Sequence, residues 1–171
     1  MKRKATFDSS FWVHAVYLNL VEFLLQDFEL ACTPAVETEI GQENPTGLKL
    51  KRLMADGAIQ RDRSHRERVK LYGAGERAAI NLALDKNLLL LIDDWKPYEA
   101  AHGYGIEVVN SLIYLVRLYD QDRLSVEVAL DALARMMRRG TAKQEWIRGS
   151  LSMVALIRQK KPMKEEHDEK N

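Results

Sequence analysis

Short apolar runs alternate along this chain with longer stretches in which apolar and polar residues mix. The strongest run covers residues 88–92, which are all apolar and are closed by Asp93 and Asp94. A run of that length and bulk predicts a central strand buried on both faces, as in parallel sheets. Weaker runs predict further strands at residues 4–7, 28–32, 58–60 and 106–109.

The stretches between these runs predict helices. Residues 75–86 carry one apolar face and end at Asn87, and Thr33 before Pro34 is typical of a helix start. Further helices are expected at residues 11–25, 48–55, 97–102, 111–119, 126–138 and 144–158. In the helix at 126–138, the stripe expected to be buried is Val126, Leu130, Leu133 and Met137. The alternation of strand and helix predicts an α/β fold with a parallel sheet and helices on both faces.

The length of 171 residues is enough to bury one core. We therefore expect one domain over residues 1–124, a helical extension over 125–159, and a charged, disordered tail over 160–171. Lys and Arg number 26 against 25 Asp and Glu, which gives a net charge of +1. Overall charge therefore does not indicate a nucleic-acid partner, and any binding face must come from local segregation of charge.

The single cysteine, Cys32, cannot form an internal disulfide, which favours a reducing compartment and predicts a cytoplasmic protein. The basic start MKRK is not followed by the pattern of a signal peptide. No apolar run approaches the roughly 20 residues that span a bilayer, so we expect no membrane partner.

Acidic residues cluster around the strongest strand. In an open α/β sheet, ligands bind beyond the carboxyl ends of the strands, where Asp93 and Asp94 would lie. Glu76 lies four residues before Ile80 and so projects toward the sheet, where a lone carboxylate is costly unless it is paired. Because converging carboxylates repel one another, this arrangement favours a cation. Oxygen ligands without a cysteine or histidine cluster indicate Mg²⁺ or Mn²⁺ rather than zinc.

Several of these acids have a second interpretation. Asp8 follows the first strand but could serve as the N-cap of the next helix, and Asp93 or Asp94 could likewise cap the helix that follows them. Glu37 and Glu39 lie on opposite flanks of the apolar stripe of their short helix, so spacing does not choose between them.

Basic residues gather in residues 61–70, immediately before the helix that carries Glu76. The segment contains Arg61, Arg63, Arg66, Arg68 and Lys70 against Asp62 and Glu67. One interpretation is a solvated surface, which is common for such charge runs. The other is a patch that contacts the phosphates of a nucleic acid beside the acidic site.

Several motifs resemble a known family when they are read in order. They are FDSS at the start, TPAVETEI, GAGERAAINLAL, and LLLLIDDWKPYEAAHGYGIEVVNS. In this order they resemble the PIN domains, and within them the VapC-like predicted nucleases that are often found beside small antitoxins. The resemblance covers residues 6–124 and is most specific over residues 75–111.

The resemblance implies a three-layer α/β/α sandwich with a central parallel sheet, followed by C-terminal helices. It also implies that three or four acids hold one or two divalent cations. By position, these acids look like Asp8, Glu39, Glu76 and Asp94, with Asp93 as a competing ligand beside Asp94. Ser9 and Ser111 resemble hydroxyl residues that support the site.

The function implied is a divalent-metal-dependent endoribonuclease that hydrolyses RNA with Mg²⁺ or Mn²⁺, in the setting of a toxin–antitoxin pair. Arg61, Arg63, Arg66 and Arg68 would contact RNA phosphates. Besides RNA, the partners to consider are an antitoxin protein and a second copy of the chain. The alternative is a catalytically inactive module of PIN shape that binds RNA or a protein.

Overall fold

The computed structural model describes residues 2–63 and 66–161. The chain divides into two compact units, residues 1–114 and residues 115–171. The boundary falls inside a helix and lies before residue 124, where the sequence places the end of the first domain. Of the tail expected at 160–171, residues 162–171 lie outside the described residues.

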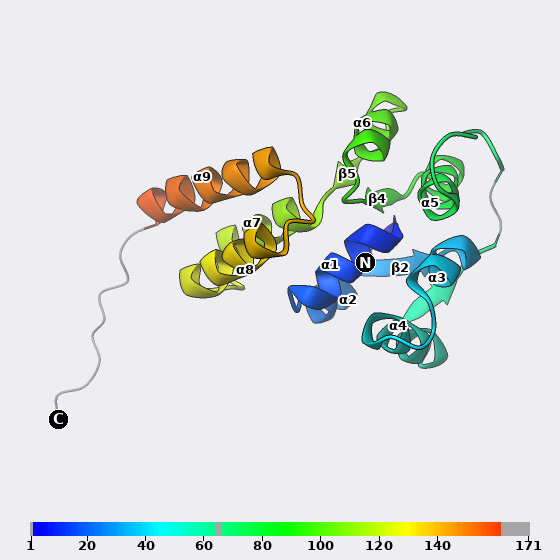
Figure 1. The fold of residues 1–171 in the computed structure, drawn as a ribbon, viewed down its shortest axis with the longest axis horizontal. Coiled ribbons are helices and arrows are strands. Elements are labelled where there is room, and N and C mark those ends of the chain that lie inside the picture. Colours follow the sequence, from blue (N-terminus) through cyan, green and yellow to red (C-terminus); the bar gives the residue numbers. More distant parts are fainter. Residues whose placement is uncertain (1, 64–65, 162–171) are drawn as a thin grey trace. The chain divides into compact units, whose positions relative to one another are not determined.

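The first unit is built on a parallel sheet of five strands in the order β3-β2-β1-β4-β5. Figure 1 shows β2, β4 and β5 of this sheet together with helices of the same unit. The strands are β1 (Arg3–Phe7), β2 (Phe28–Cys32), β3 (Ile59–Arg61), β4 (Leu89–Leu91) and β5 (Val108–Val109). Each overlaps a strand that the sequence predicts, and β5 is shorter than expected. The predicted α/β class with a central parallel sheet is therefore confirmed.

Helices connect the strands. Those of the first unit are α1 (Ser9–Tyr17), α2 (Val21–Asp27), α3 (Pro34–Ile40), α4 (Pro45–Ala55), α5 (Ala74–Lys86) and α6 (Trp95–Gly103). Right-handed crossovers between parallel strands place α1 to α4 on one face of the sheet and α5 and α6 on the other. The amphipathic segment at residues 11–25 forms two helices because Asn19 between them adopts a left-handed conformation, with φ 59°.

Local sequence fixes the ends of these helices. The Thr33 hydroxyl oxygen accepts a hydrogen bond from Val36 N at 3.3 Å, and Pro34 occupies the first turn of α3, as predicted. At the other end of α5, Asn87 adopts the left-handed conformation that commonly ends a helix. The helix that carries Glu76 thus begins and ends within one residue of its predicted limits.

Strand β4 lies at the centre of the core. Leu89, Leu90 and Leu91 are all buried, and the strand pairs with β1 on one side and β5 on the other. On the adjacent strand, the ring of Phe7 stacks on Trp12 of α1 with centroids 5.2 Å apart, and both side chains are buried. This packing holds α1 against the carboxyl end of β1.

The strand order reverses direction between β1 and β4. The chain runs outward from β1 through β2 to β3, then crosses back through α5 to β4 on the other side of β1. In open α/β sheets, ligands bind at this switch point, beyond the carboxyl ends of the two strands. Asp8 directly follows β1, and Asp93 lies two residues after β4.

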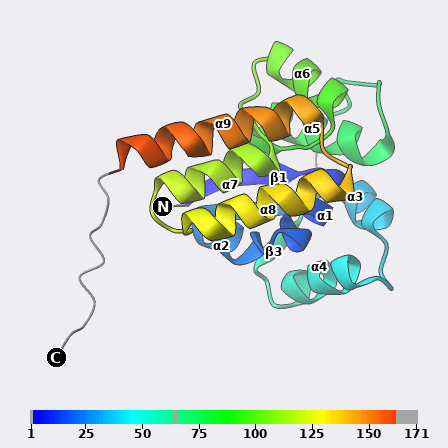
Figure 2. The same cartoon turned by 60° about the vertical axis from the view of Figure 1, so that its left-hand side comes forward.

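The second unit contains α8 (Val126–Arg139) and α9 (Gln144–Lys160), which pack against each other (Figure 2), and α7 (Ser111–Asp120) spans the boundary between the units. The stripe expected in α8 is wrong in part. The buried side chains are Ala129, Ala132, Leu133 and Met136, whereas Leu130 and Met137 are 38% and 50% exposed. The helix is amphipathic as predicted, but the buried stripe is shifted around its axis.

Among the helices that the structure describes, none is both long enough and apolar enough to span a membrane.

Candidate active site

Acidic residues lie at the edge of the sheet where β1 and β4 end. Asp8 begins the turn into α1, and its backbone N–H donates to the carbonyl of Leu91 in β4 at 3.1 Å. Asp93 and Asp94 follow β4, and Asp94 takes the N-cap position of α6. The switch point of the sheet therefore positions acids from both central strands.

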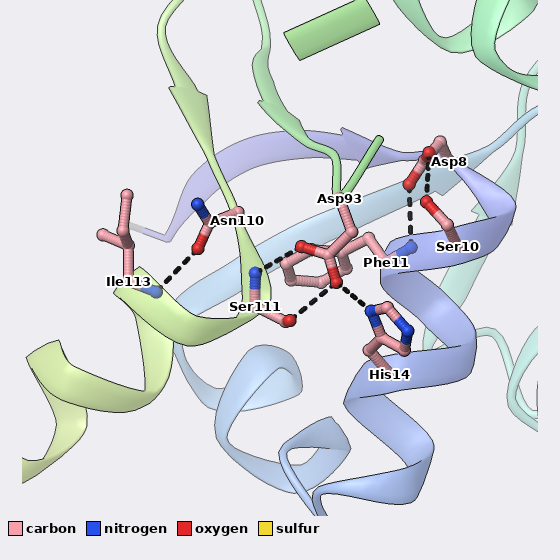
Figure 3. A network of polar contacts seen from close by, with 8 residues as sticks. All are labelled: Asp8, Ser10, Phe11, His14, Asp93, Asn110, Ser111 and Ile113. Atoms are coloured by element: carbon pink, nitrogen blue, oxygen red, sulfur yellow. Dashed lines mark hydrogen bonds and ion pairs between the residues drawn. The ribbon is translucent and has the colours of Figure 1, made fainter. Parts of the chain in front are cut away.

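Asp8 is fully buried. Its Oδ1 accepts a hydrogen bond from Phe11 N at 2.8 Å, and the Ser10 hydroxyl donates to its Oδ2 at 2.6 Å (Figure 3). Asp8 thus caps α1. Burial raises the pKa of this carboxyl well above its usual range, and the charges of Asp93 and Asp94 raise it further. A buried carboxylate with acidic neighbours is the environment in which a cation would stabilise the charged form.

Asp93 and Asp94 are adjacent but have different surroundings. Asp93 is buried, and its Oδ1 accepts from Ser111 N at 2.7 Å. Its Oδ2 accepts from the Ser111 hydroxyl at 2.6 Å and lies 2.5 Å from His14 Nδ1 (Figure 3). Asp94 is exposed, and the structure shows no capping hydrogen bond of its side chain within the described residues. Asp93 is held by the fold, whereas Asp94 faces outward.

His14 was not identified from the sequence. It lies four residues after Ser10, so both side chains fall on the same side of α1. His14 is 5% exposed within a helix that is otherwise largely apolar. A histidine in such a helix needs a polar partner, which is the sequence signal that could have found it.

Glu39 is tied to two other elements. Its Oε1 accepts from Gly75 N in the first turn of α5 at 2.6 Å, and the Ser9 hydroxyl of α1 donates to its Oε2 at 2.7 Å. Glu37 on the same helix points elsewhere and forms an ion pair of 2.8 Å with Arg61. The structure thus places Glu39 rather than Glu37 beside the first turn of α5.

Two glycines make room for the carboxylates. A Cβ added to Gly75 would clash with the carboxylate of Glu39, and a Cβ added to Gly73 would clash with the carboxylate of Glu76. The start of α5 therefore forms a cradle, meaning a space that holds the two carboxylates and exists only because Gly73 and Gly75 have no side chain. The sequence shows these glycines, but it does not show what fills the space they leave.

Glu76 couples these acids to Asp94. Its pKa is raised, first by partial burial and then by the charge of Asp94, and the charge of Glu39 and a hydrogen bond with Asp94 act in the same direction. Glu76 and Asp94 line one cavity of about 430 Å³ together with Tyr72, Gly73, Trp95, Lys96 and Pro97. Asp8, Glu39, Glu76 and Asp94 thus form one chain of interacting acids, called here the acidic cluster.

The acidic cluster has no ion-pair partner in the part of the chain that the structure describes. Within residues 2–63 and 66–161, no Lys, Arg or His forms an ion pair with any of its four members. In this part of the chain, no three His, Cys, Asp or Glu side chains are already arranged to hold one metal ion. The donors nevertheless fit a hard divalent cation in kind, because they are carboxylate oxygens, and two of them, on Glu76 and Asp94, line an exposed cavity.

The arginines of the basic segment do not share one environment. Arg61 pairs with Glu37, and Arg68 pairs with Asp85 at 3.5 Å. Arg66 is exposed. Arg63 lines a cavity of about 490 Å³ between α3 and α5 together with Thr33, Pro34, Ala35, Glu67, Ala74, Arg77, Ala78 and Asn81.

Arg77 in this cavity forms an ion pair of 3.6 Å with Glu67, which lines the same cavity. It was not singled out from the sequence, where it reads as one more polar helix residue after Glu76.

Known protein families and solved structures include matches to this chain. The family model described as the PIN domain matches residues 5–153. Among solved structures, the chain is similar to a PilT N-terminus domain protein from the hyperthermophilic archaeon Sulfolobus solfataricus. The two share 16% sequence identity over 76% of this chain and 93% of that chain, with a TM-score of 0.43. No curated protein sequence matches this chain.

Proposed function

Because the chain belongs to the PIN domain family, whose members are generally nucleases that use divalent metal ions, we propose that it is an endoribonuclease dependent on Mg²⁺ or Mn²⁺. The observation that supports this proposal is the acidic cluster. Its members come from four separate segments of the chain and interact pairwise, Asp8 with Asp94, Asp94 with Glu76, and Glu76 with Glu39. Their mutual repulsion destabilises the fold unless a cation offsets it, so the arrangement suits binding of a cation better than stability.

The metal ligands we propose are Asp8, Glu39, Glu76 and Asp94. A divalent ion held by carboxylates supplies an activated water and offsets the charge that develops on the phosphate during hydrolysis. The residues of the chain orient the ligands. Ser9 and Gly75 N fix Glu39, while Ser10 and Phe11 N fix Asp8.

Asp93 has a different role in this proposal. Its Oδ2 has two partners, the Ser111 hydroxyl and His14, and its Oδ1 accepts from Ser111 N, whereas each oxygen of Asp8 has one hydrogen-bond partner among the described residues. Because Asp93 has less capacity left for a metal ion, it acts in this proposal as a positioning residue rather than as a ligand. Its negative charge still bears on Asp8. The supporting role expected of Ser111 is thus assigned to its two hydrogen bonds with Asp93.

The RNA backbone needs positive charge near the acidic cluster. Arg63 and Arg77 line the cavity beside α5, and Ala74 in that cavity is the neighbour of Gly73 in the cavity of the acidic cluster. We propose that these arginines contact RNA phosphates, with Arg66 as a further exposed contact. Arg77 would have to exchange its present partner Glu67 for a phosphate. The same holds for Arg61 and Arg68, which pair with Glu37 and Asp85.

Paired substitution of the acids tests the nuclease. Asp94→Asn with Glu76→Gln removes two negative charges and keeps similar shapes. We expect the purified variant to lose at least about 100-fold in Mn²⁺-dependent cleavage of RNA, because ligands held in the correct geometry supply much of the rate. Glu99→Gln, an exposed acid on α6, is the matched control and should cleave as the wild type does. Unchanged cleavage by the double variant would show that the nuclease assignment is wrong.

Metal binding can be measured without activity. An ion that binds only the folded state stabilises it by about 2.7 kcal/mol at 100 times its Kd. We expect Mn²⁺ to raise the melting temperature of the wild type and to have a much smaller effect on the double variant. Equal melting curves with and without millimolar Mn²⁺ would favour the alternative, an inactive module of PIN shape that binds RNA or a protein.

The toxin role follows from the resemblance to VapC-like proteins and is a separate part of the proposal. An antitoxin would restrain the enzyme by placing a cationic side chain against the acidic cluster. Expression of the wild type in the bacterial cytoplasm should then arrest growth, and Asp94→Asn should relieve the arrest. Growth arrest by both proteins alike would count against a nuclease toxin. Light scattering would show whether a second copy is also a partner.

A further inference from the structure

An aromatic side chain lines the cavity that contains Glu76 and Asp94. Trp95 is the first residue of α6 and directly follows Asp94. Its indole stacks with the ring of Tyr98, with centroids 6.3 Å apart and planes 7° from parallel. Trp95 lines the same cavity of about 430 Å³ as Glu76 and Asp94, and it is half-buried. The cavity therefore combines carboxylates with an aromatic side chain that is stacked on a neighbouring ring outside the cavity lining.

The other residues of the cavity suit the same kind of ligand. Lys96 is exposed next to Trp95 and adds a positive charge to the wall. Tyr72 lines the same cavity and adds a second aromatic side chain to its wall. The cavity thus presents carboxylates, a cation and two aromatic residues within one hollow.

A nucleotide has the chemistry that matches this combination. Its phosphate is the group that a metal held by carboxylates would engage, and its base has a flat face that stacks on aromatic side chains. In a duplex, the bases already stack on one another and their faces are not available. An indole beside the carboxylates therefore fits an unpaired nucleotide better than a base pair.

We infer that Trp95, supported by Tyr98, is the stacking surface for one base of a single-stranded RNA, next to the phosphate that is cleaved. This inference rests on the proposed nuclease function for its ligand, and it names the substrate class as single-stranded. It also predicts how affinity depends on the base, because stacking accepts every base and favours those with larger faces. Lys96 is placed to contact the phosphate of the same or the neighbouring nucleotide.

Binding of a labelled hexanucleotide tests the inference. Fluorescence anisotropy with calcium in place of magnesium measures affinity, and a gel checks that the RNA stays intact. We expect Trp95→Ala to weaken binding by about 5- to 150-fold, which is the range for loss of one stacked base. Trp95→Phe should retain most of the affinity, whereas Trp95→Leu, which keeps an apolar side chain without an aromatic face, should not. A duplex of the same sequence should bind each variant equally.

Tyr104→Ala is the matched control. Tyr104 follows α6, is 51% exposed, and is not among the residues that line the cavity. We expect it to bind the hexanucleotide as the wild type does. Melting curves of all variants, recorded beside the binding data, show which of them keep the fold.

Removal of one base at a time separates stacking from a structural role. For the wild type, an abasic site at one position should weaken binding as much as Trp95→Ala does. With Trp95→Phe, the same abasic site should cost about as much as it does for the wild type, and with Trp95→Leu it should cost little more. Equal sensitivity of wild type and Trp95→Leu at every position would overturn the inference, as would tight binding by Trp95→Leu.

The outcome is distinct from a failure of the proposed function. If the wild type binds single-stranded RNA through Trp95 but does not cleave it with Mn²⁺, the nuclease is wrong and the stacking surface stands. If it cleaves RNA and Trp95→Leu cleaves with unchanged KM, the nuclease stands and the stacking surface is wrong. Absence of binding by the wild type overturns the inference directly.

Discussion

Gly75 lies in the first turn of α5, where its missing side chain leaves space for the carboxylate of Glu39. Replacing it with alanine adds one methyl group at that point. The group would clash with the end of the Glu39 side chain, and this end can move because it is flexible. We therefore expect Gly75→Ala to displace the carboxylate and to leave the helix in place.

The effect on stability should be small because two terms oppose each other. Alanine in place of glycine in a helix stabilises by about 0.5–1 kcal/mol. Displacing Glu39 loses the hydrogen bond from Gly75 N at 2.6 Å, which is worth about 1–2 kcal/mol for a charged acceptor that is partly exposed. The net change should thus lie between zero and a loss of about 1.5 kcal/mol in the free energy of unfolding.

The effect on activity should be large. A misplacement of about 1 Å can reduce a rate by about 100-fold, and a displaced ligand weakens metal binding as well. We expect RNA cleavage with Mn²⁺ to fall by about 100-fold, while urea unfolding shows little change. Glu39→Asp in the same chain shortens the acid by one methylene group and should recover part of the lost metal affinity.

Gly149→Ala on α9 is the matched control for the same chemical change. An added Cβ there meets no described atom within 4 Å, so it should stabilise slightly and leave cleavage unchanged. If Gly75→Ala cleaves RNA and binds Mn²⁺ as the wild type does, the first turn of α5 is not the cradle of a ligand. If Gly75→Ala instead lowered the free energy of unfolding by several kcal/mol, Gly75 would be required by the fold.

Further predictions concern stability and reactivity. The pKa values of Asp8 and Glu76 are raised in the metal-free fold, so the folded state binds protons more tightly than the unfolded chain. In urea unfolding, the free energy of unfolding should therefore rise as the pH falls from above the raised pKa of Asp8 toward 3.8, its ordinary value. Asp8→Asn should make the free energy of unfolding depend less on pH over this range. Asn81 is buried, accepts from two backbone N–H groups and donates to the carbonyl of Val69, so Asn81→Ala should cost about 2–4 kcal/mol in the same assay. Burial raises the pKa of Cys32 to about 12, and iodoacetamide at pH 8 should label it only at the rate of unfolding; rapid labelling of the native protein would contradict its burial.

The parts of the fold that the sequence predicts are those in which local signals suffice. The apolar run at residues 88–92 contains β4, and the pair Thr33–Pro34 begins α3 as expected. The buried stripe of α8 was not predictable in the same way. Large apolar residues suggested one stripe, but Ala129 and Ala132 lie on the buried one, because small side chains allow close approach at a helix contact. Burial there depends on the partner helix, which a single helix pattern does not show.

The choice between neighbouring acids depends on residues far away in the chain. Asp93 and Asp94 are equivalent in the sequence, and the structure separates them because Ser111 and His14 reach only Asp93. These partners lie on α7 and α1, and the local sequence around β4 does not predict them. The sequence could therefore place an acidic site at the end of β4, but it could not say which aspartate faces the cavity.

The ion pair between Arg61 and Glu37 shows that the candidate metal ligands and the candidate phosphate contacts cannot be assigned separately. Glu37 and Glu39 could each be read as a ligand, and Arg61 as a contact for RNA. Their ion pair of 2.8 Å engages one candidate of each kind and leaves Glu39 with Ser9 and Gly75 N. Because the pair is partly exposed, it contributes little to stability, and its main consequence is to neutralise a glutamate on the helix that also carries Glu39. A charge run in a sequence gains or loses a binding role through such partners, and these partners are a property of the fold.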